Sequence, residues 1–521
     1  MGIENWALKI ENFLIRKIKL KYLQLKKHLL ILLLLLPMLA TAANPKREFR
    51  GAWLHIIGQT QYMNLQQKGS SELQKYIADQ IDRLHRSGCN AIIFQVRPTA
   101  DAAYISELEP WSSWISGTRG KAPNPIWDPL QFAIDEAHKR GMELHAWLNP
   151  YRVTSNPKEV LPADHLSKKH PERFFKYDGK VFFDPAYQEN RDFICDIVKD
   201  ITERYDIDAI HIDDYFYPYP VAGKTIPDAE SYKKFGSNEN IGDWRRHNVD
   251  MLIEQMNSTI KTAKPWVRFG VSPFGIWRNK KTDPRGSDSN GLQNYDGLYA
   301  DVLLWAKNGW VDYLAPQLYW ELDLKAAPSR HLAHWWNDNS EGVDIYIGQD
   351  VRRTMNSADP KAGDKNELGT KVKLSRELPN IKGNVWWHGY WVTENMKGVA
   401  DSLAYVHQNT VALPPAYGDQ RQHPSPVKNL QLKKKDGKLY LQWDSEKIKH
   451  KATDPIRFVV YSFLEDEKPD LNNVEAIMTL TPRKEYLVSE DDDRESLKGM
   501  IFAVTALDRN NRESEAVQIE P

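Results

Sequence analysis

Short apolar runs recur along the chain, and most of them end in polar or aromatic residues. Helix-like stretches separate them: Ile77, Ile81 and Leu84 follow helical spacing, and residues 130–141 end at Gly141, as a capped helix does. Strands that alternate with helices pair in parallel, so eight such units predict an α/β fold, a (β/α)8 TIM barrel. The predicted strands are residues 50–57, 91–98, 143–150, 209–218, 267–275, 313–320, 344–350 and 383–391.

An open doubly wound sheet is the alternative arrangement for this alternation. That fold usually carries a glycine-rich phosphate loop after its first strand, and no such loop follows residues 50–57. We therefore expect a barrel over residues 47–415, with long insertions.

The C-terminal part has a different pattern. Residues 416–426, which include Pro424 and Pro426, predict a linker. Beyond it, residues 439–443, 457–463 and 500–507 are strand-like and have no helix between them, which predicts a small all-β sandwich over residues 427–521. Its opening, Pro-x-Pro-Val-x-Asn-Leu-x-Leu, together with Trp443 and Tyr461, resembles a fibronectin type III domain.

The N-terminus has the pattern of an export signal. Lys26, Lys27 and His28 precede an apolar run over residues 29–36, and small residues follow up to Ala43. The run is too short to span a bilayer, so we predict a signal peptide over residues 1–42 and a secreted or periplasmic mature protein with no stable membrane insertion. The long stretch before Lys26 favours a translation start further along.

Charge and cysteine content narrow the function classes. Lys+Arg and Asp+Glu are both 70, so the net charge is 70 − 70 = 0, which argues against a nucleic-acid partner. With two cysteines, neither a disulfide framework nor a cysteine-rich zinc site is available. We expect Cys89 and Cys195 to be single buried thiols, and we expect no metal or other cofactor.

Strand alternation sorts the polar residues by face. In residues 143–150 it points His145, Trp147 and Asn149 toward the barrel axis, and in residues 209–218 it does the same for His211 and Asp213. Barrel interiors are normally filled by Val, Ile and Leu, and function lies at the carboxyl ends of the strands. These polar inner faces therefore predict an active-site mouth. The same alternation groups Gln95 with Arg97, and Ala315 with Gln317 and Tyr319.

Tryptophan is abundant, with 18 in the chain. Buried packing explains many tryptophans in any protein, and a lone strand histidine such as His55 is more often a hydrogen-bonded core residue than a catalyst. Several indoles nevertheless fall at or just beyond predicted strand ends, where flat sugar rings could stack on them. These are Trp147, Trp277, Trp320, Trp386, Trp387 and Trp391.

The adjacent residues Asp213 and Asp214 are the clearest indication of a catalytic site. Two adjacent carboxylates at the end of a strand are costly unless they are solvated, hydrogen-bonded or metal-bound. Alternation points Asp213 inward and Asp214 toward the barrel wall. We expect a catalytic role for Asp213 first and for Asp214 second.

Several long motifs resemble the glycosyl hydrolase-like 10 family. They are FRGAWLH, QVRPTADAAYISELEPWSSWISG, DEAHKRGMELHAWLNPYR, IHIDDYFYP, VSPFGIWRN and APQLYW. The resemblance covers residues 47 to 415 and implies a TIM barrel with glycosidase activity on bacterial cell-wall glycan. The family includes a member that acts on peptidoglycan strands stripped of their stem peptides.

Glycoside hydrolysis needs one ionised and one protonated carboxyl group. We expect Asp213 to be the ionised group, kept charged by nearby His211 and Arg97. Asp101 and Glu321 are equal candidates for the acid, and Asp214 is the next. The residues expected to bind sugar are Arg97, His145, Trp147, Asn149, Tyr151, Arg152, His211, Tyr215, Gln317, Tyr319, Trp320, Trp387 and His388.

Two other functions remain open at this point. A metal-dependent hydrolase or deacetylase could use His145, His211 and Asp213, with His55 as a further ligand. A non-catalytic glycan-binding barrel would keep the aromatic residues without the chemistry. The sequence does not fix the oligomeric state.

Overall fold

The computed structural model describes residues 44–236, 238–466, 468–491 and 494–521. The predicted export signal, residues 1–42, lies outside this part of the chain. Among the helices that are described, none has the length and apolar character needed to cross a bilayer.

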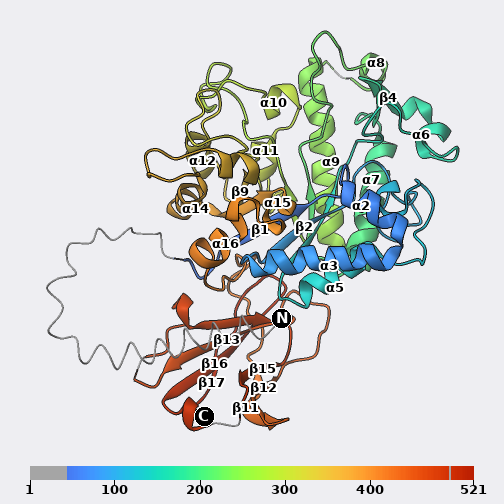
Figure 1. The fold of residues 1–521 in the computed structure, drawn as a ribbon. Coiled ribbons are helices and arrows are strands. Elements are labelled where there is room, and N and C mark those ends of the chain that lie inside the picture. The colour runs from blue at the N-terminus through green and yellow to red at the C-terminus, as the bar shows by residue number, and fades with distance from the viewer. Residues whose placement is uncertain (1–43, 237, 467, 492–493) are drawn as a thin grey trace. The chain divides into compact units, whose positions relative to one another are not determined.

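Eight parallel strands close into a barrel in the order β1-β10-β9-β8-β7-β6-β3-β2 (Figure 1). This confirms the eight predicted strands and the TIM barrel, and it rejects the open sheet. β6, β7, β8 and β10 end at least four residues earlier than predicted. The strands are β1 (Phe49–Leu54), β2 (Ala91–Arg97), β3 (Glu143–Leu148), β6 (Ala209–Ile212), β7 (Arg268–Val271), β8 (Tyr313–Leu314), β9 (Asp344–Asp350) and β10 (Ile381–Trp387).

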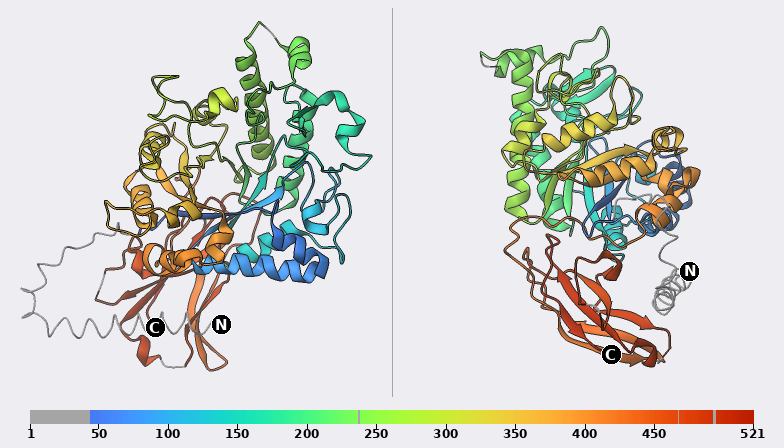
Figure 2. Two further views of the ribbon diagram at one scale, coloured as in Figure 1. Left: turned by 45° about the horizontal axis from the view of Figure 1, so that its top comes forward. Right: turned by 90° about the vertical axis from the view of Figure 1, so that its left-hand side faces the viewer.

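Helices surround this ring of strands (Figure 2). Leu144 and Leu148 point outward from β3 and are buried in the layer between strands and helices. The main helices are α3 (Ser70–Arg86), α5 (Pro129–His138), α7 (Gln188–Arg204), α9 (Ile241–Ala263), α11 (Val302–Lys307), α12 (Ser329–Asp338) and α14 (Leu368–Glu377). Shorter ones are α2 (Thr60–Leu65), α4 (Ser113–Ser116), α6 (Leu166–Lys169), α8 (Ala229–Phe235), α10 (Asn294–Gly297), α13 (Val351–Asn356), α15 (Gly389–Thr393) and α16 (Val399–Ser402).

The barrel interior is aromatic rather than aliphatic. Phe49 stacks on Tyr346 with ring centroids 4.0 Å apart, and Tyr313 lies 4.9 Å from Tyr346. Trp53 and Ile93 are buried in the same inner core. Large inward rings fill the axis, so the barrel is a packed core with its functional face at the strand ends.

The C-terminal strands form two antiparallel sheets, which confirms the all-β prediction. One sheet has the order β11-β12-β15 and the other β14-β13-β16-β17. The fibronectin type III assignment stays a prediction. The strands are β11 (Lys428–Lys435), β12 (Lys438–Asp444), β13 (Arg457–Leu464), β14 (Ile477–Thr481), β15 (Glu485–Ser489), β16 (Met500–Leu507) and β17 (Val517–Ile519). A hairpin of β4 (Phe174–Tyr177) and β5 (Lys180–Phe183) lies between β3 and α7.

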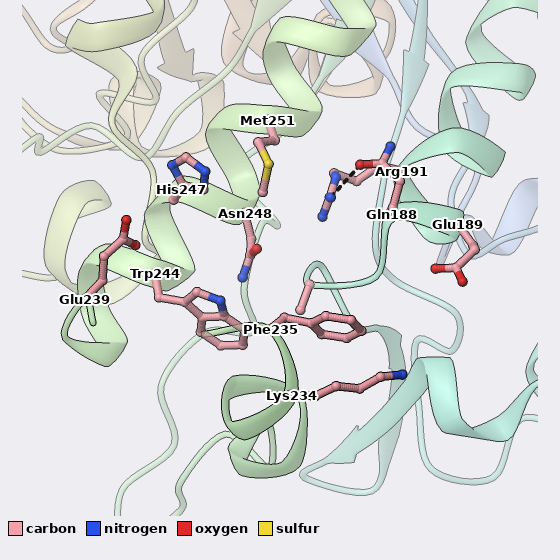
Figure 3. Close-up of a pocket in the computed structure, with 11 residues that line it drawn as sticks. Gln188, Glu189, Arg191, Lys234, Phe235, Glu239, Trp244, His247, Asn248 and Met251 are labelled. Carbon is pink, nitrogen blue, oxygen red and sulfur yellow. Dashed lines mark hydrogen bonds between the residues drawn. The ribbon is translucent and has the colours of Figure 1, made fainter. Parts of the chain in front are cut away.

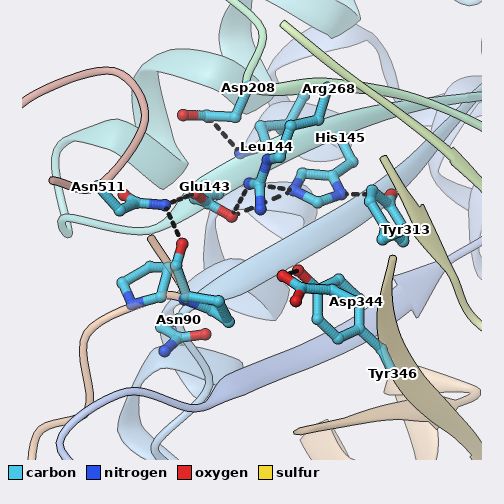
Figure 4. Close-up of polar contacts among 12 residues, drawn as sticks. Asn90, Glu143, Leu144, His145, Asp208, Arg268, Tyr313, Asp344, Tyr346 and Asn511 are labelled. Carbon is cyan, nitrogen blue, oxygen red and sulfur yellow. Dashed lines mark hydrogen bonds and ion pairs between the residues drawn. The ribbon is translucent and has the colours of Figure 1, made fainter. Parts of the chain in front are cut away.

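Polar contacts join this β-rich part to the amino end of the barrel. Asn511 donates a 2.7 Å hydrogen bond to the buried Glu143 at the start of β3 (Figure 4). Tyr417, within the predicted linker, donates to Asp312 at 2.7 Å. The segment expected to be a linker is therefore anchored on the barrel.

Candidate active site

Asp213 directly follows β6 and is 4% exposed. It accepts hydrogen bonds from Trp147 Nε1 at 3.1 Å and from Asn149 Nδ2 at 2.9 Å. β3 and β6 are neighbours in the barrel, with Trp147 level with His211. Strand alternation, continued for one residue past the ends of β3 and β6, thus brings three side chains to one point at the carboxyl end of the barrel, as the sequence predicts.

The cation that acts on Asp213 is Arg152. Burial raises the pKa of Asp213, while the charge of Arg152 and the bonds from Asn149 and Trp147 oppose that rise. Arg152 is held by a bond from its backbone N–H to Asn149 Oδ1 at 2.9 Å, and its guanidinium lies 4.6 Å from the Tyr215 ring centroid. Tyr215 is 37% exposed, so this pair borders solvent.

Arg97 does not serve Asp213, and that part of the prediction is wrong. Both ends of its guanidinium bind the buried Glu109, at 2.7 and 2.6 Å. A register shift in β2 places Gln95 level with Trp147 but Arg97 level with Leu148, so the two do not share a face. Arg97 has the simpler role of neutralising a buried carboxylate.

Asp214 is 2% exposed and has a different environment from Asp213. Tyr219 donates a short hydrogen bond to its Oδ2, and Gln317 is a second side-chain partner. Burial and then the negative charge of Asp213 raise the pKa of Asp214 to about 7. Because β6 ends at Ile212, strand alternation no longer governs this residue. A carboxyl group with such a pKa holds its proton for much of the time near neutral pH.

The other two acid candidates lie in different surroundings. Asp101 is fully buried, accepts a bond from Thr99 Oγ1 at 3.2 Å and lies 3.3 Å from Arg119. Burial raises the pKa of Asp101 to about 6. The backbone carbonyl of Glu321 accepts bonds from the loop that follows it, including one from Ser329. Among the described residues, neither acid has a hydrogen bond or ion pair to Asp213 or Asp214, so Asp214 is the better-placed partner.

Aromatic rings gather beside the two aspartates. Tyr319 and Trp387, both half-buried, stack with centroids 6.1 Å apart and an angle of 13°. Trp147 and Trp53 meet Trp387 edge-on at 6.1 and 6.2 Å. Trp320 lies 5.4 Å from Phe274, and His388 stacks on Trp391 at 4.9 Å; all four are also half-buried.

Three of the aromatic side chains expected at strand ends lie elsewhere. Trp277, Trp386 and Tyr151 are at most 2% exposed and pack in the core between strands and helices. Strand alternation explains the position of Trp386. Its neighbour Trp387 lies on the inner face of β10, so Trp386 points outward toward the helices. These three belong to the core and not to the half-buried rings beside the two aspartates.

His145 and His211 lie deep in the barrel axis. Trp53 donates to His211 Nε2 at 3.2 Å, and Tyr313 Oη lies 3.0 Å from His211 Nδ1 and 2.8 Å from His145 Nδ1. The other ring nitrogen of His145, Nε2, lies 3.2 Å from Oε2 of Glu143 (Figure 4). Burial lowers the pKa of both imidazoles, so both are neutral. Neither can keep Asp213 charged, and that part of the prediction is also wrong.

The same placement bears on the metal alternative. His145 and His211 share Tyr313 instead of converging with Asp213 on one point. Across the described ranges, no three His, Cys, Asp or Glu side chains form a group that could hold a metal ion. Cys89 and Cys195 are free and buried, as expected.

Three residues beside the carboxylates were missed by the sequence analysis. Tyr219 contacts Asp214, and Trp53 lies among the aromatic rings. Asp350, half-buried at the end of β9, acts electrostatically on Tyr319 together with Asp213 and Asp214. Alternation along β9 could have predicted that Asp350 faces the barrel axis. Tyr346, four residues earlier on the same strand, lies on the same face and is buried in the inner core.

Comparison with known proteins shows the family of this chain. The glycosyl hydrolase-like 10 family matches residues 48–364. Glycosyl hydrolase YngK of Bacillus subtilis strain 168 is 37% identical over 491 residues, which cover 92% of this chain and 94% of that protein. Glycosyl hydrolase DigH of Escherichia coli strain K12 is 36% identical over 371 residues, covering 66% and 84%.

Among solved structures, the catalytic domain of β-amylase from Paenibacillus polymyxa has a TM-score of 0.45 at 13% identity, covering 70% of this chain and 99% of that chain. The family match and the two relatives span most of the barrel. The chain belongs to the glycosyl hydrolase-like 10 family, and it is a glycosidase of that family.

Proposed function

We propose that the protein hydrolyses a bacterial cell-wall polysaccharide, namely peptidoglycan strands that have lost their stem peptides. The observation that carries the proposal is the contrast between two adjacent buried carboxyl groups. Burial raises the pKa of both groups, but two side-chain donors and a nearby guanidinium oppose this rise at Asp213, whereas the charge of Asp213 adds to it at Asp214, whose pKa reaches about 7. Glycosidases need such a contrast, with one group ionised and the other protonated.

In this mechanism Asp214 donates its proton to the glycosidic oxygen as the C–O bond breaks. Asp213 remains ionised and acts at the anomeric carbon, either as the nucleophile or as the base that activates a water molecule. Trp147, Asn149 and Arg152 stabilise its charge. Water adds overall, one product gains the new anomeric hydroxyl, and the other gains the hydroxyl that the acid protonated.

The surrounding side chains suit a sugar. Tyr319 and Trp387 offer half-buried ring faces on which a pyranose could stack. Gln317, Tyr215 and His388 add polar groups at the same end of the barrel. Burial lowers the pKa of His388 to about 4, so its ring is neutral and can both donate and accept near neutral pH.

The substrate class rests on the family resemblance together with the predicted export signal. An exported glycosidase meets the cell wall before other polysaccharides. In a direct test, intact and peptide-free peptidoglycan are incubated with the protein, and released fragments are identified by mass spectrometry. We expect fragments from the peptide-free strands; release from neither polymer would contradict the proposal and favour a glycan-binding barrel.

A further inference from the structure

A pocket opens among the ends of three helices (Figure 3). It has a volume of about 660 Å³ and is lined by residues from α7, α8 and α9. Barrel helices run opposite to the strands, so the first turns of α7 and α9 lie at the carboxyl face. Asn248, which lines the pocket, contacts the hydroxyl of Tyr217 at 3.4 Å, three residues beyond Asp214.

Arg191 brings a buried positive charge to this pocket, which Glu189 and Glu239 also line. It is 4% exposed, and it donates to the carbonyl of Pro185 and to Gln188 Oε1, each at 2.7 Å. Its Nε is buried and has no hydrogen-bond partner among the described residues. A buried guanidinium is costly unless its donors and its charge are satisfied. An anionic oxygen bound in the pocket would give the charge of this guanidinium a partner.

Aromatic rings form the opposite side of the pocket. Phe235 is 41% exposed and packs edge-on against Tyr187 at 5.0 Å, while Trp244 lies beside it as Figure 3 shows. Lys234 lies over the Phe235 ring at 4.6 Å, so it adds a second positive charge at the rim. An exposed ring face with polar groups across from it is typical of a site for a flat, polar ligand.

We propose that this pocket is a distal sugar subsite that binds a carboxylate-bearing unit of the glycan. Arg191 would receive the carboxylate, Lys234 would supplement its charge, and the exposed part of the Phe235 ring would contact the sugar. The inference rests on the proposed function, because the ligand is another part of the strand that Asp213 and Asp214 cleave. Peptide-free peptidoglycan fits this chemistry, since removal of the peptide exposes a lactyl carboxylate on alternate sugars.

The test compares long peptide-free strands with single disaccharides, and with neutral chitin oligosaccharides as a charge control. Phe235→Ala should raise KM for the long strands about tenfold, which corresponds to about 1.4 kcal/mol, and leave kcat unchanged. Single disaccharides cannot reach both sites, so their KM should not move. Lys234→Gln should raise KM for the anionic strands and not for chitin oligosaccharides, whereas Lys233→Gln, on the neighbouring exposed residue, should change neither.

Direct binding separates a failure of this inference from a failure of the proposed function. Calorimetric titration with long peptide-free strands should show weaker binding to Phe235→Ala than to the wild type, whether or not the wild type cleaves them. Unchanged KM and unchanged affinity in both variants would overturn the subsite. Equal losses on chitin and anionic strands in Lys234→Gln would overturn its preference for a carboxylate.

Discussion

The indole N–H of Trp147 donates to Oδ2 of Asp213 across 3.1 Å. This bond connects the ends of two neighbouring strands, and it favours the ionised form of a carboxyl group whose burial works in the other direction. The aromatic ring that packs edge-on against Trp387 therefore also tunes the electrostatics of the proposed catalytic group.

Replacing Trp147 by Phe removes the donor and keeps a ring. A hydrogen bond to a charged group contributes about 1.5–3 kcal/mol, so the pKa of Asp213 should rise by about one unit or more. We expect the acidic limb of the pH–kcat/KM profile to move to higher pH. Trp443→Phe, in the C-terminal sheets, is the matched control and should leave the profile in place. An unmoved limb in Trp147→Phe would show that this bond does not tune the ionised group.

The basic limb should report Asp214. Its pKa is about 7 in the folded protein, so the protonated acid is lost, and activity with it, as pH rises through this value. The hydrogen bond from Tyr219 favours ionised Asp214 and lowers its pKa. Tyr219→Phe should therefore move the basic limb of the profile to higher pH, and a shift to lower pH would contradict this account.

The buried ion pair of Arg97 and Glu109 should stabilise the folded protein. Both side chains are at most 2% exposed, so Arg97→Met leaves a buried carboxylate without its partner and should cost about 3–5 kcal/mol of unfolding free energy. The double variant Arg97→Met/Glu109→Leu should recover part of that loss. Arg86→Met breaks an exposed pair with Asp82 and should cost less than about 1 kcal/mol in the same denaturant titration. Equal losses from Arg97→Met and Arg86→Met would contradict the buried-pair role.

Asn511 should couple the C-terminal sheets to the stability of the barrel. Its φ is 58°, a conformation that glycine also adopts, so Asn511→Gly removes the side chain without backbone strain. The loss of its bond to buried Glu143 should cost about 1–3 kcal/mol and lower the thermal midpoint of the whole chain. Asn472→Ala, on an exposed loop, serves as control; no change in Asn511→Gly would mean that the contact contributes nothing to stability.

Periodicity predicted the fold well because it reports burial directly. All eight barrel strands and the helix-free C-terminal part follow from apolar runs and their spacing. The register shift in β2 escaped this reasoning, because one extra residue reverses the face of Arg97 without changing the apolar pattern. The short hairpin of β4 and β5 was missed because two four-residue strands carry little periodic signal.

The candidate site was predictable only in part. Alternation on two neighbouring strands was enough to bring Trp147 and Asn149 to Asp213. It could not tell a deep inward position from one at the mouth, so His145 and His211 were assigned to sugar although Tyr313 binds both. The acid partner depends on burial and on the neighbouring charge, and neither can be obtained from spacing alone.

We propose that Asp213 and Asp214 together cleave peptide-free glycan strands. This can be measured as the rate of reducing-end release from those strands by the wild type, Asp213→Asn and Asp214→Asn, each checked for an unchanged thermal midpoint. We expect release by the wild type and a loss of at least about 10²-fold in both variants. Wild-type rates in either folded variant would contradict the claim.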